Sequence, residues 1–284
     1  MTVIEAVLFG IIQGLTEFLP ISSTAHLTLA GKLLGLITPE RAASWTAFMA
    51  VLQLGTLIAV IVYFAEDLRL MAASLARDVR SRGQGIGFRG FSEHSRLALL
   101  IVLGTIPVVV VGVLFQEVIR GMFTKSTLVI IASLTLLAIV LWIAERVAKH
   151  TRQLAETNVV DAIAVGCAQA LALIPGSSRS GTTLTAGLLL GLTRPAAARF
   201  SFLLSIPAIL GSGAFELLTI DPSVFSYGIA NLVIATVISA ASGYAAIAWL
   251  LKFLSNHTTL AFIWYRLALA AVLAVFLASG LIGR

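Results

Sequence analysis

The chain has 284 residues, of which 59% are hydrophobic and 11% are charged, and its mean hydropathy is +1.02. A water-soluble domain carries about 25% charged residues, so this composition excludes a soluble globular protein. The formal net charge of +6 comes from basic residues that stand between apolar runs rather than on one amphipathic face. This pattern is typical of membrane topology signals and excludes a nucleic-acid partner.

The first apolar stretch, residues 3–30, is interrupted at Pro20 by the sequence PISST. A lipid-facing helix cannot carry such a break, because the freed backbone groups would find no hydrogen-bond partners in the hydrocarbon. Interrupted backbone at membrane depth is tolerated where it is buried in protein or lines a wet cavity. The stretch is therefore predicted to be a re-entrant helix pair that enters and leaves the membrane on one side.

Three apolar runs long enough to cross the bilayer follow this first stretch. They cover residues 47–65, 97–115 and 127–147. The polar stretch 66–96 lies between the first two runs and is rich in arginine and glycine. It is predicted to be a solvated cytoplasmic loop.

The second half of the chain repeats this order. Residues 159–191 form another broken stretch, interrupted at Pro175 by PGSSRSGTT. Three further runs follow it, at 200–218, 227–250 and 260–282. The sequences around the breaks also match, since QGLTEFLPISS begins at residue 13 and QALALIPGSS at residue 169.

Each half therefore holds one re-entrant pair and three spans, and because three is odd the second half must enter the membrane from the opposite side. The predicted fold is a single all-α integral membrane domain of six transmembrane helices plus two re-entrant helix pairs. Residues 1–147 and 159–284 form the two halves of an inverted-topology repeat. Such repeats place a binding site near the bilayer midplane, where the broken segments meet.

Basic residues indicate the orientation of the chain. With the N-terminus outside, twelve of them fall in predicted cytoplasmic segments and five in outer ones, which the positive-inside rule favours. Half of the twelve, including Arg82 and Arg89, lie in the 66–96 stretch, and Arg284 counts among the outer five.

Polar residues around the first break could carry out chemistry. Gln13 and Glu17 are four residues apart and so share a helix face. If a new helix starts at Ser22, then Ser23 and His26 lie three apart on one face, within reach of a common ligand. A carboxylate, two serines and a histidine at a helix break favour a catalytic site over polar groups that merely satisfy one another.

The second break has the composition of an anion site. An arginine supplies a planar donor fork suited to phosphate oxygens, and glycines let the backbone approach a ligand closely. A helix restarting at Thr182 would point its N-terminal amides at the anion. A flexible turn would explain the glycines, but not hydroxyls on five of nine residues. The candidate phosphate-binding residues are Gly176, Ser177, Ser178, Arg179, Ser180 and Thr183, with Ser22 from the first break.

Four further polar residues stand inside apolar runs, namely Gln53, Gln169, Glu216 and Arg266. Each could line the cavity or simply cross-link helices, and the sequence leaves both interpretations open.

The motifs QGLTEFLPISSTAH (13–26) and PGSSRSGTT (175–183) resemble the bacitracin-resistance family of undecaprenyl-diphosphate phosphatases. The resemblance extends through FMAVLQLGTLIAV (48–60), FSFLLSIP (200–207) and Tyr265-Arg266. It implies a bacterial inner-membrane hydrolase, open to the periplasm, that recycles the C55 carrier lipid for cell-wall synthesis and confers bacitracin resistance. The implied fold has inverted repeats with re-entrant helices.

The resemblance also implies roles for individual residues. Gln13 and Glu17 match a motif implicated with a divalent cation, Mg²⁺ or Ca²⁺. The matching catalytic residues are Glu17, Ser23, His26 and Arg179, and the diphosphate-binding ones include Thr183, with Ser178 beside them. Gln13, Met49 and Arg199 depart from the family by standing where relatives often have an acid. Because cations need hard oxygen ligands, one metal held by Glu17 and the substrate's own phosphates is expected.

The sequence leaves the nucleophile open among His26, Ser23 and water. The expected partners are a polyprenyl diphosphate and membrane lipids, and the oligomeric state is open, a homodimer included. The rival interpretation is a secondary transporter or a lipid flippase, which would need the anion-binding break without the hydrolytic residues.

Overall fold

Six long apolar helices form the body of the protein in the computed structural model, which describes residues 1–81, 90–218 and 222–283. They are α3 (Ala42–Tyr63), α5 (Glu93–Leu114), α7 (Thr127–Val147), α10 (Arg194–Leu218), α11 (Ile229–Asn256) and α12 (Leu260–Ala278). All six are long and apolar enough to cross a membrane, which confirms the six predicted spans. Several begin earlier than predicted, because polar residues extend the helix at its N-terminal end. Helix α10 also has Pro195 in its first turn, where the missing backbone N–H of a proline costs nothing.

Both broken stretches are helix pairs: α1 (Val3–Phe18) with α2 (Ser23–Leu33), and α8 (Val159–Leu171) with α9 (Arg179–Leu189). Ser22 and Ser178 cap the second helix of each pair, and each accepts a hydrogen bond from the backbone N–H three residues on. Both serines have a positive φ, 75° and 68°, which is unusual for a residue with a Cβ. The two breaks therefore share one construction, as the repeated sequence predicts.

Short helices connect the longer ones. They are η1 (Pro39–Arg41), α6 (Gln116–Arg120), η4 (Met122–Lys125), η5 (Leu154–Glu156) and η6 (Pro222–Tyr227).

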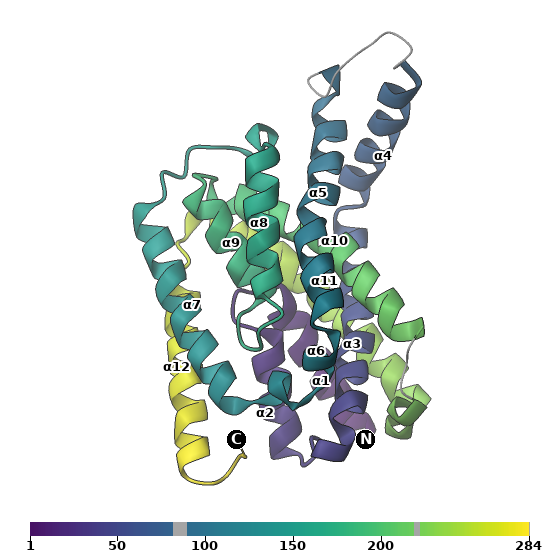
Figure 1. Cartoon of the computed structure of the whole chain (residues 1–284), viewed down its shortest axis with the longest axis vertical. Helices are drawn as coiled ribbons and strands as arrows, with labels where there is room; N and C mark the ends of the chain where they lie inside the picture. Colours follow the sequence, from purple (N-terminus) through teal and green to yellow (C-terminus); the bar gives the residue numbers. More distant parts are fainter. Residues whose placement is uncertain (82–89, 219–221, 284) are drawn as a thin grey trace.

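The two halves of the chain pack by the same pairings. α1 packs along α11 and α8 packs along α5, while α3 contacts α11 and α10 contacts α5. Two further contacts, α3 with α10 and α7 with α12, join the first predicted spans and the third predicted spans of the two halves. In Figure 1, α1 and α2 lie in the lower part of the molecule and α8 and α9 in the upper part. The breaks therefore approach each other in the middle.

The described part of the stretch predicted as a solvated loop, residues 66–81 and 90–96, is largely helical. Helix α4 (Ala65–Arg80) covers its first half, and α5 begins at Glu93. The carboxylate of Asp78 ties the two helices together by accepting hydrogen bonds from the N–H and the hydroxyl of Ser92 and from the hydroxyl of Ser95. These bonds hold the pKa of Asp78 below its ordinary value. Residues 82–89, with Arg82 and Arg89, and Arg284 lie outside the described residues.

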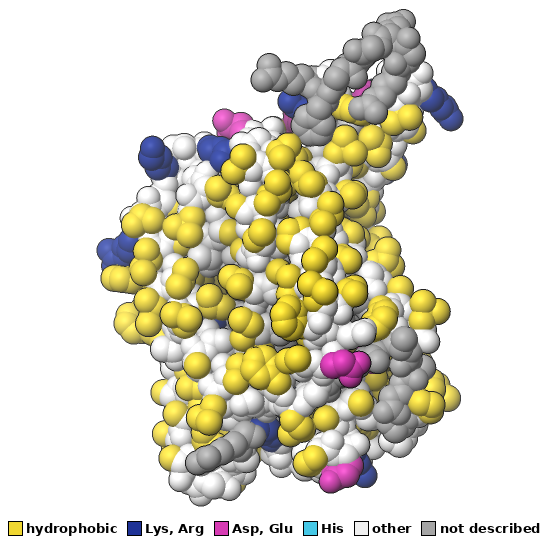
Figure 2. All heavy atoms as spheres, in the orientation of Figure 1, with side chains coloured by type: hydrophobic (Ala, Val, Ile, Leu, Met, Phe, Trp, Pro, Cys, Tyr) yellow, Lys and Arg dark blue, Asp and Glu magenta, His cyan; other side chains and the backbone are white. Residues whose placement is uncertain are grey.

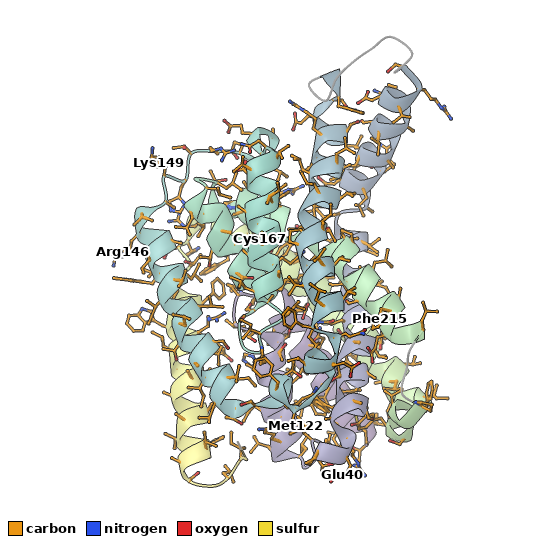
Figure 3. All side chains as sticks on the ribbon, in the orientation of Figure 1. Glu40, Met122, Arg146, Lys149, Cys167 and Phe215 are labelled. Atoms are coloured by element: carbon orange, nitrogen blue, oxygen red, sulfur yellow. The ribbon has the colours of Figure 1, made fainter. Side chains whose placement is uncertain are left out.

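The surface of the helix bundle is apolar in its middle. Figure 2 shows hydrophobic side chains spread over this face, with few charged ones among them. Val102 of α5 and Leu136 of α7 are each 62% exposed, and a water-soluble monomer rarely leaves such a large apolar patch uncovered. Arg146 and Lys149 lie near one end of α7, and Met122 and Glu40 near the other end of the molecule (Figure 3). The chain is a multi-pass membrane protein.

Glycines allow the broken segments to pack closely against the spans. A Cβ at Gly14 in α1 would lie 2.6 Å from the carbonyl oxygen of Ser239 and 2.7 Å from the backbone nitrogen of Gly243, both in α11. Backbone atoms cannot step aside as a flexible side chain can. Gly14 is therefore a contact point that fixes α1 against α11.

We expect Gly14→Ala to destabilise the protein by about 1–3 kcal/mol, because the new methyl group forces α1 away from α11. Thermal unfolding in detergent measures the effect. Gly112→Ala in α5 is the matched control, since a Cβ there has nothing within 4 Å, and its midpoint should stay the same or rise. Equal losses in the two variants would contradict the role of Gly14.

Candidate functional site

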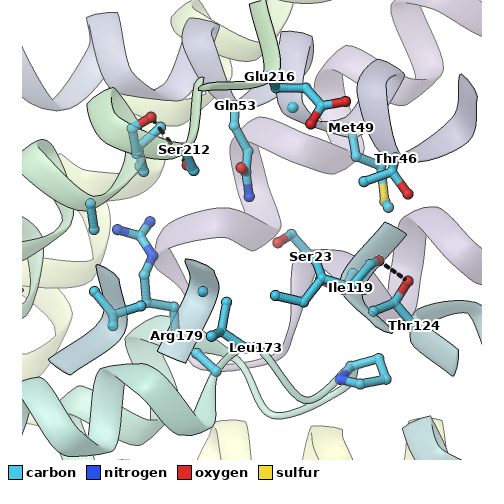
Figure 4. Close-up of a pocket in the computed structure, with 18 of the residues that line it drawn as sticks. Ser23, Thr46, Met49, Gln53, Ile119, Thr124, Leu173, Arg179, Ser212 and Glu216 are labelled. Carbon is cyan, nitrogen blue, oxygen red and sulfur yellow. Dashed lines mark hydrogen bonds between the residues drawn. The ribbon is translucent and has the colours of Figure 1, made fainter. Parts of the chain in front are cut away.

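A cavity of about 410 Å³ lies where the two breaks meet. Its walls come from both broken segments and from α3, α5 and α10. Figure 4 shows Arg179 approaching the cavity from one side and Ser23 from the other, with Gln53 and Glu216 farther along it. Residues from both predicted motifs therefore line one space.

A buried ion pair joins the two motifs. Nη2 of Arg179, the first residue of α9, donates to Oε1 of Glu17 in α1 at 2.7 Å, although the two residues are 162 positions apart. The side chains are 15% and 3% exposed. The predicted meeting of the arginine-bearing break with the glutamate is confirmed by this contact.

The second carboxylate oxygen of Glu17 binds two neighbours from its own break. Oε2 accepts hydrogen bonds from Nε2 of Gln13 at 3.0 Å and from Oγ of Ser23 at 2.6 Å. A carboxylate that accepts a hydrogen bond from a serine hydroxyl is placed to act as the general base for that serine. The group nearest to Ser23 with that capacity is thus Glu17.

His26 points elsewhere. Its Nδ1 lies 2.7 Å from the carbonyl oxygen of Ser22, so Nδ1 carries the proton, and its Nε2 lies 2.7 Å from the hydroxyl of Tyr265. The two rings stack with centroids 5.6 Å apart. In the described part of the chain, His26 is not among the residues that line the cavity. The expectation that Ser23 and His26 face a common ligand is not met by this geometry, and the catalytic role of His26 stays a prediction.

The hydroxyls of the second break divide into two groups. Ser178 lines the cavity, as do Ser22 and Ser23 of the first break. Ser180 instead donates to the carbonyl oxygen of Leu19 at 2.9 Å, so it joins the two breaks. The hydroxyl of Thr183 lies 2.7 Å from the carbonyl oxygen of Arg179 and also contacts Ser201.

Four residues predicted to bind phosphate are not among those that line the cavity in the described structure, namely Gly176, Ser177, Ser180 and Thr183. Other protein groups engage the hydroxyls of Ser180 and Thr183, whereas the buried hydroxyl of Ser177 has no hydrogen-bond partner among the described residues. At Gly176, which has a φ of 85°, a Cβ would lie 2.7 Å from the carbonyl oxygen of Ile130. That glycine lets the break approach α7 rather than a ligand. Helix α9 begins at Arg179, three residues earlier than predicted.

The polar residues left open by the sequence also divide. Gln53, Gln169 and Glu216 line the cavity. Arg266 is 1% exposed and cross-links helices, since the acceptors of its guanidinium in the described part of the chain are all backbone carbonyl oxygens. Polar residues of the connecting segments, Gln116 and Thr124, line the cavity as well and gave no signal in the sequence.

The donor set offers limited ligands for a metal. Within residues 1–81, 90–218 and 222–283, no three His, Cys, Asp or Glu side chains gather at one point. Glu17 is the carboxylate between the breaks, and Oε1 of Gln13 is buried with no hydrogen-bond partner in the described structure. These two hard oxygens fit one divalent cation that takes its other ligands from a bound phosphate.

Comparison with known proteins gives a consistent result. The family model described as bacitracin resistance protein BacA matches residues 6–272. A protein of Syntrophobacter fumaroxidans named undecaprenyl-diphosphatase is 48% identical, with 96% of each chain covered. A protein of the same name from Chloroherpeton thalassium is 46% identical over 99% of this chain and 98% of its own, and one from Myxococcus xanthus is 46% identical over 99% and 91%.

Proposed function

We propose, on the premise that this chain belongs to the bacitracin resistance protein BacA family, that it hydrolyses undecaprenyl diphosphate to undecaprenyl phosphate and inorganic phosphate. It is an integral membrane phosphatase that recycles the lipid carrier for cell-wall synthesis. The observation that carries the proposal is the contact of Arg179 with Glu17, whose other carboxylate oxygen accepts a hydrogen bond from the hydroxyl of Ser23. This combines an anion-binding group, a base and a nucleophile at one cavity.

The chemistry follows from these contacts. Glu17 takes the proton of Ser23 as its oxygen attacks the terminal phosphorus, and the bond from that phosphorus to the bridging oxygen breaks. Undecaprenyl phosphate leaves, and water then hydrolyses the phosphoserine. Nη1 of Arg179 has no hydrogen-bond partner within the described chain, so it is available to a phosphate oxygen, where negative charge develops.

A divalent cation, Mg²⁺ or Ca²⁺, would neutralise phosphate charge when bound. Glu17 and Oε1 of Gln13 would hold it from the protein side. One such ion suits this chain better than two, because Glu17 is the carboxylate that a broken segment brings to the cavity, while Glu216, the other one among the described lining residues, comes from α10.

The prenyl chain would leave the cavity sideways between α5 and α10. A volume of about 410 Å³ is at the small end of ligand pockets, so it accommodates a headgroup and the start of a long lipid but not its whole chain. Gly112 of α5 and Gly211 of α10 line this side, and a Cβ at either would meet nothing within 4 Å.

We further propose that the two halves form an inverted repeat, with each broken segment re-entrant from its own side of the bacterial inner membrane. The matched packing of α1 on α11 and α8 on α5 supports this arrangement. The charge bias supports an outer N-terminus and a cavity that opens to the periplasm.

Phosphate release from farnesyl diphosphate, by purified protein in detergent with Mg²⁺, tests the proposal. We expect turnover that a chelator suppresses, and a loss of about a thousandfold or more in Ser23→Ala. Labelled phosphate should be trapped on Ser23 and not in that variant.

The same assay separates the enzyme from its rival. A transporter or flippase would bind the lipid yet release no phosphate. Robust release that persists in Ser23→Ala would refute Ser23 as the nucleophile and return the choice to His26 or water.

A further inference from the structure

Gln169 is a buried polar residue that has no role in the proposed reaction. It stands near the end of α8, its side chain is 0% exposed, and it lines the same cavity as Glu17 and Arg179. Neither its amide nitrogen nor its amide oxygen has a hydrogen-bond partner among the residues that the structure describes. Burying an amide in this state lowers stability, so a residue of this type indicates a ligand that completes it.

The position of Gln169 matches that of Gln13 in the first half. Gln13 donates to Glu17, which lies four residues farther along α1. The residue four positions after Gln169 is Leu173, so the second half offers its glutamine no carboxylate. The second half therefore has the glutamine of the first half but lacks the glutamate that accepts a hydrogen bond from it.

Unpartnered groups from the two helices of the second broken stretch, α8 and α9, therefore face one cavity. Arg179 contributes Nη1, and Gln169 contributes an amide whose NH₂ can donate two hydrogen bonds. The non-bridging oxygens of a diphosphate only accept hydrogen bonds, and a charged acceptor makes the stronger bonds. Donors arriving from α8 and from α9 would hold such a group from two sides.

We infer that Gln169 is a substrate-binding residue whose side-chain amide donates a hydrogen bond to a phosphate oxygen of the lipid diphosphate. This inference rests on the proposed function and adds a residue from α8 to the site. It also explains why this buried amide is kept in an apolar helix.

Two apolar replacements test it. In Gln169→Leu and Gln169→Met, the KM for farnesyl diphosphate should rise by about 10- to 100-fold, the loss of a hydrogen bond to a charged group. The thermal midpoint without substrate should not fall, because the unpartnered amide is gone. Cys167→Ala, an exposed position on the same helix, is the control and should leave KM unchanged.

Gln169→Glu decides which amide atom matters. A carboxylate should repel the diphosphate and raise KM at least as much as leucine does, without lowering the Mg²⁺ concentration that gives half-maximal rate. A lower Mg²⁺ requirement would show that the residue binds the cation through its oxygen and would overturn the inference. A KM within twofold of wild type in both apolar variants would overturn it as well.

A binding measurement tests the role of Gln169 independently of whether the protein is a phosphatase. A farnesyl diphosphate analogue with a methylene bridge cannot be hydrolysed, so its affinity can be measured whether or not the protein releases phosphate. Absence of turnover in wild type would refute the proposed function alone. Unchanged affinity for the analogue in Gln169→Leu would refute the role of Gln169 alone.

Discussion

Replacing Arg179 by methionine is expected to destabilise the protein by about 3–5 kcal/mol and to abolish phosphate release. The destabilisation follows because the variant removes the guanidinium that pairs with the carboxylate of Glu17, a group that is 3% exposed. The activity falls because a phosphate oxygen loses its charged donor, a loss of about 100- to 1,000-fold or more in kcat. Thermal unfolding in detergent and phosphate release from farnesyl diphosphate measure the two effects.

The double variant Glu17→Gln/Arg179→Met separates stability from activity. With both charges removed, most of the lost stability should return, because a neutral amide replaces the unpaired carboxylate. Activity should stay lost, since base and phosphate donor are both gone. A double variant that releases phosphate at the wild-type rate would refute the site.

A surface ion pair provides the matched control for this cycle. Arg69 and Glu66 form a comparable contact in α4, at 2.6 Å, but their side chains are 65% and 67% exposed. Solvent screens such pairs, so Arg69→Met should leave the unfolding midpoint and the activity unchanged. Equal effects of Arg69→Met and Arg179→Met would mean that burial of the inner pair is not the cause.

The fold was predictable where its signals are local. Apolar runs set the six spans, and the prolines at 20 and 175 set the breaks, because each signal depends on neighbouring residues alone. The meeting of Glu17 with Arg179 followed from the repeat, since matching breaks in two halves place their polar groups together. The helix α4 was missed because its polar composition is equally typical of a loop.

The individual contacts of the site were less predictable. The direction of His26 depends on Tyr265, which is 239 residues away, and helical spacing from Ser23 contains no information about that ring. The hydroxyls of Ser180 and Thr183 are suited to phosphate by type, but nearby carbonyl groups engage them in the folded chain. The sequence shows how many hydroxyls the break contains, but not which of them will hydrogen-bond to the protein itself.

Arg266 is another residue whose role depends on distant contacts. Its residue type in an apolar helix fits a cavity or a cross-link equally well, and only its contacts decide. No acidic partner pairs with it in the described chain. Its guanidinium donates instead to five carbonyl oxygens at 3.1–3.3 Å, those of Pro20, Ser133, Leu134, Gly176 and Ser177. It thereby holds both breaks against α7.

We expect Arg266→Met to destabilise the protein by about 3–5 kcal/mol, because several buried carbonyl oxygens lose their donors at once. Arg266→Lys should recover part of this loss, since an ammonium offers three donors without the planar fork. Thermal unfolding measures both variants, and phosphate release should fall in the same order, because Glu17 and Arg179 meet only while the two breaks are held together. If Arg266→Met kept wild-type stability and activity, the breaks would be held by the Ser180 contact and by helix packing alone.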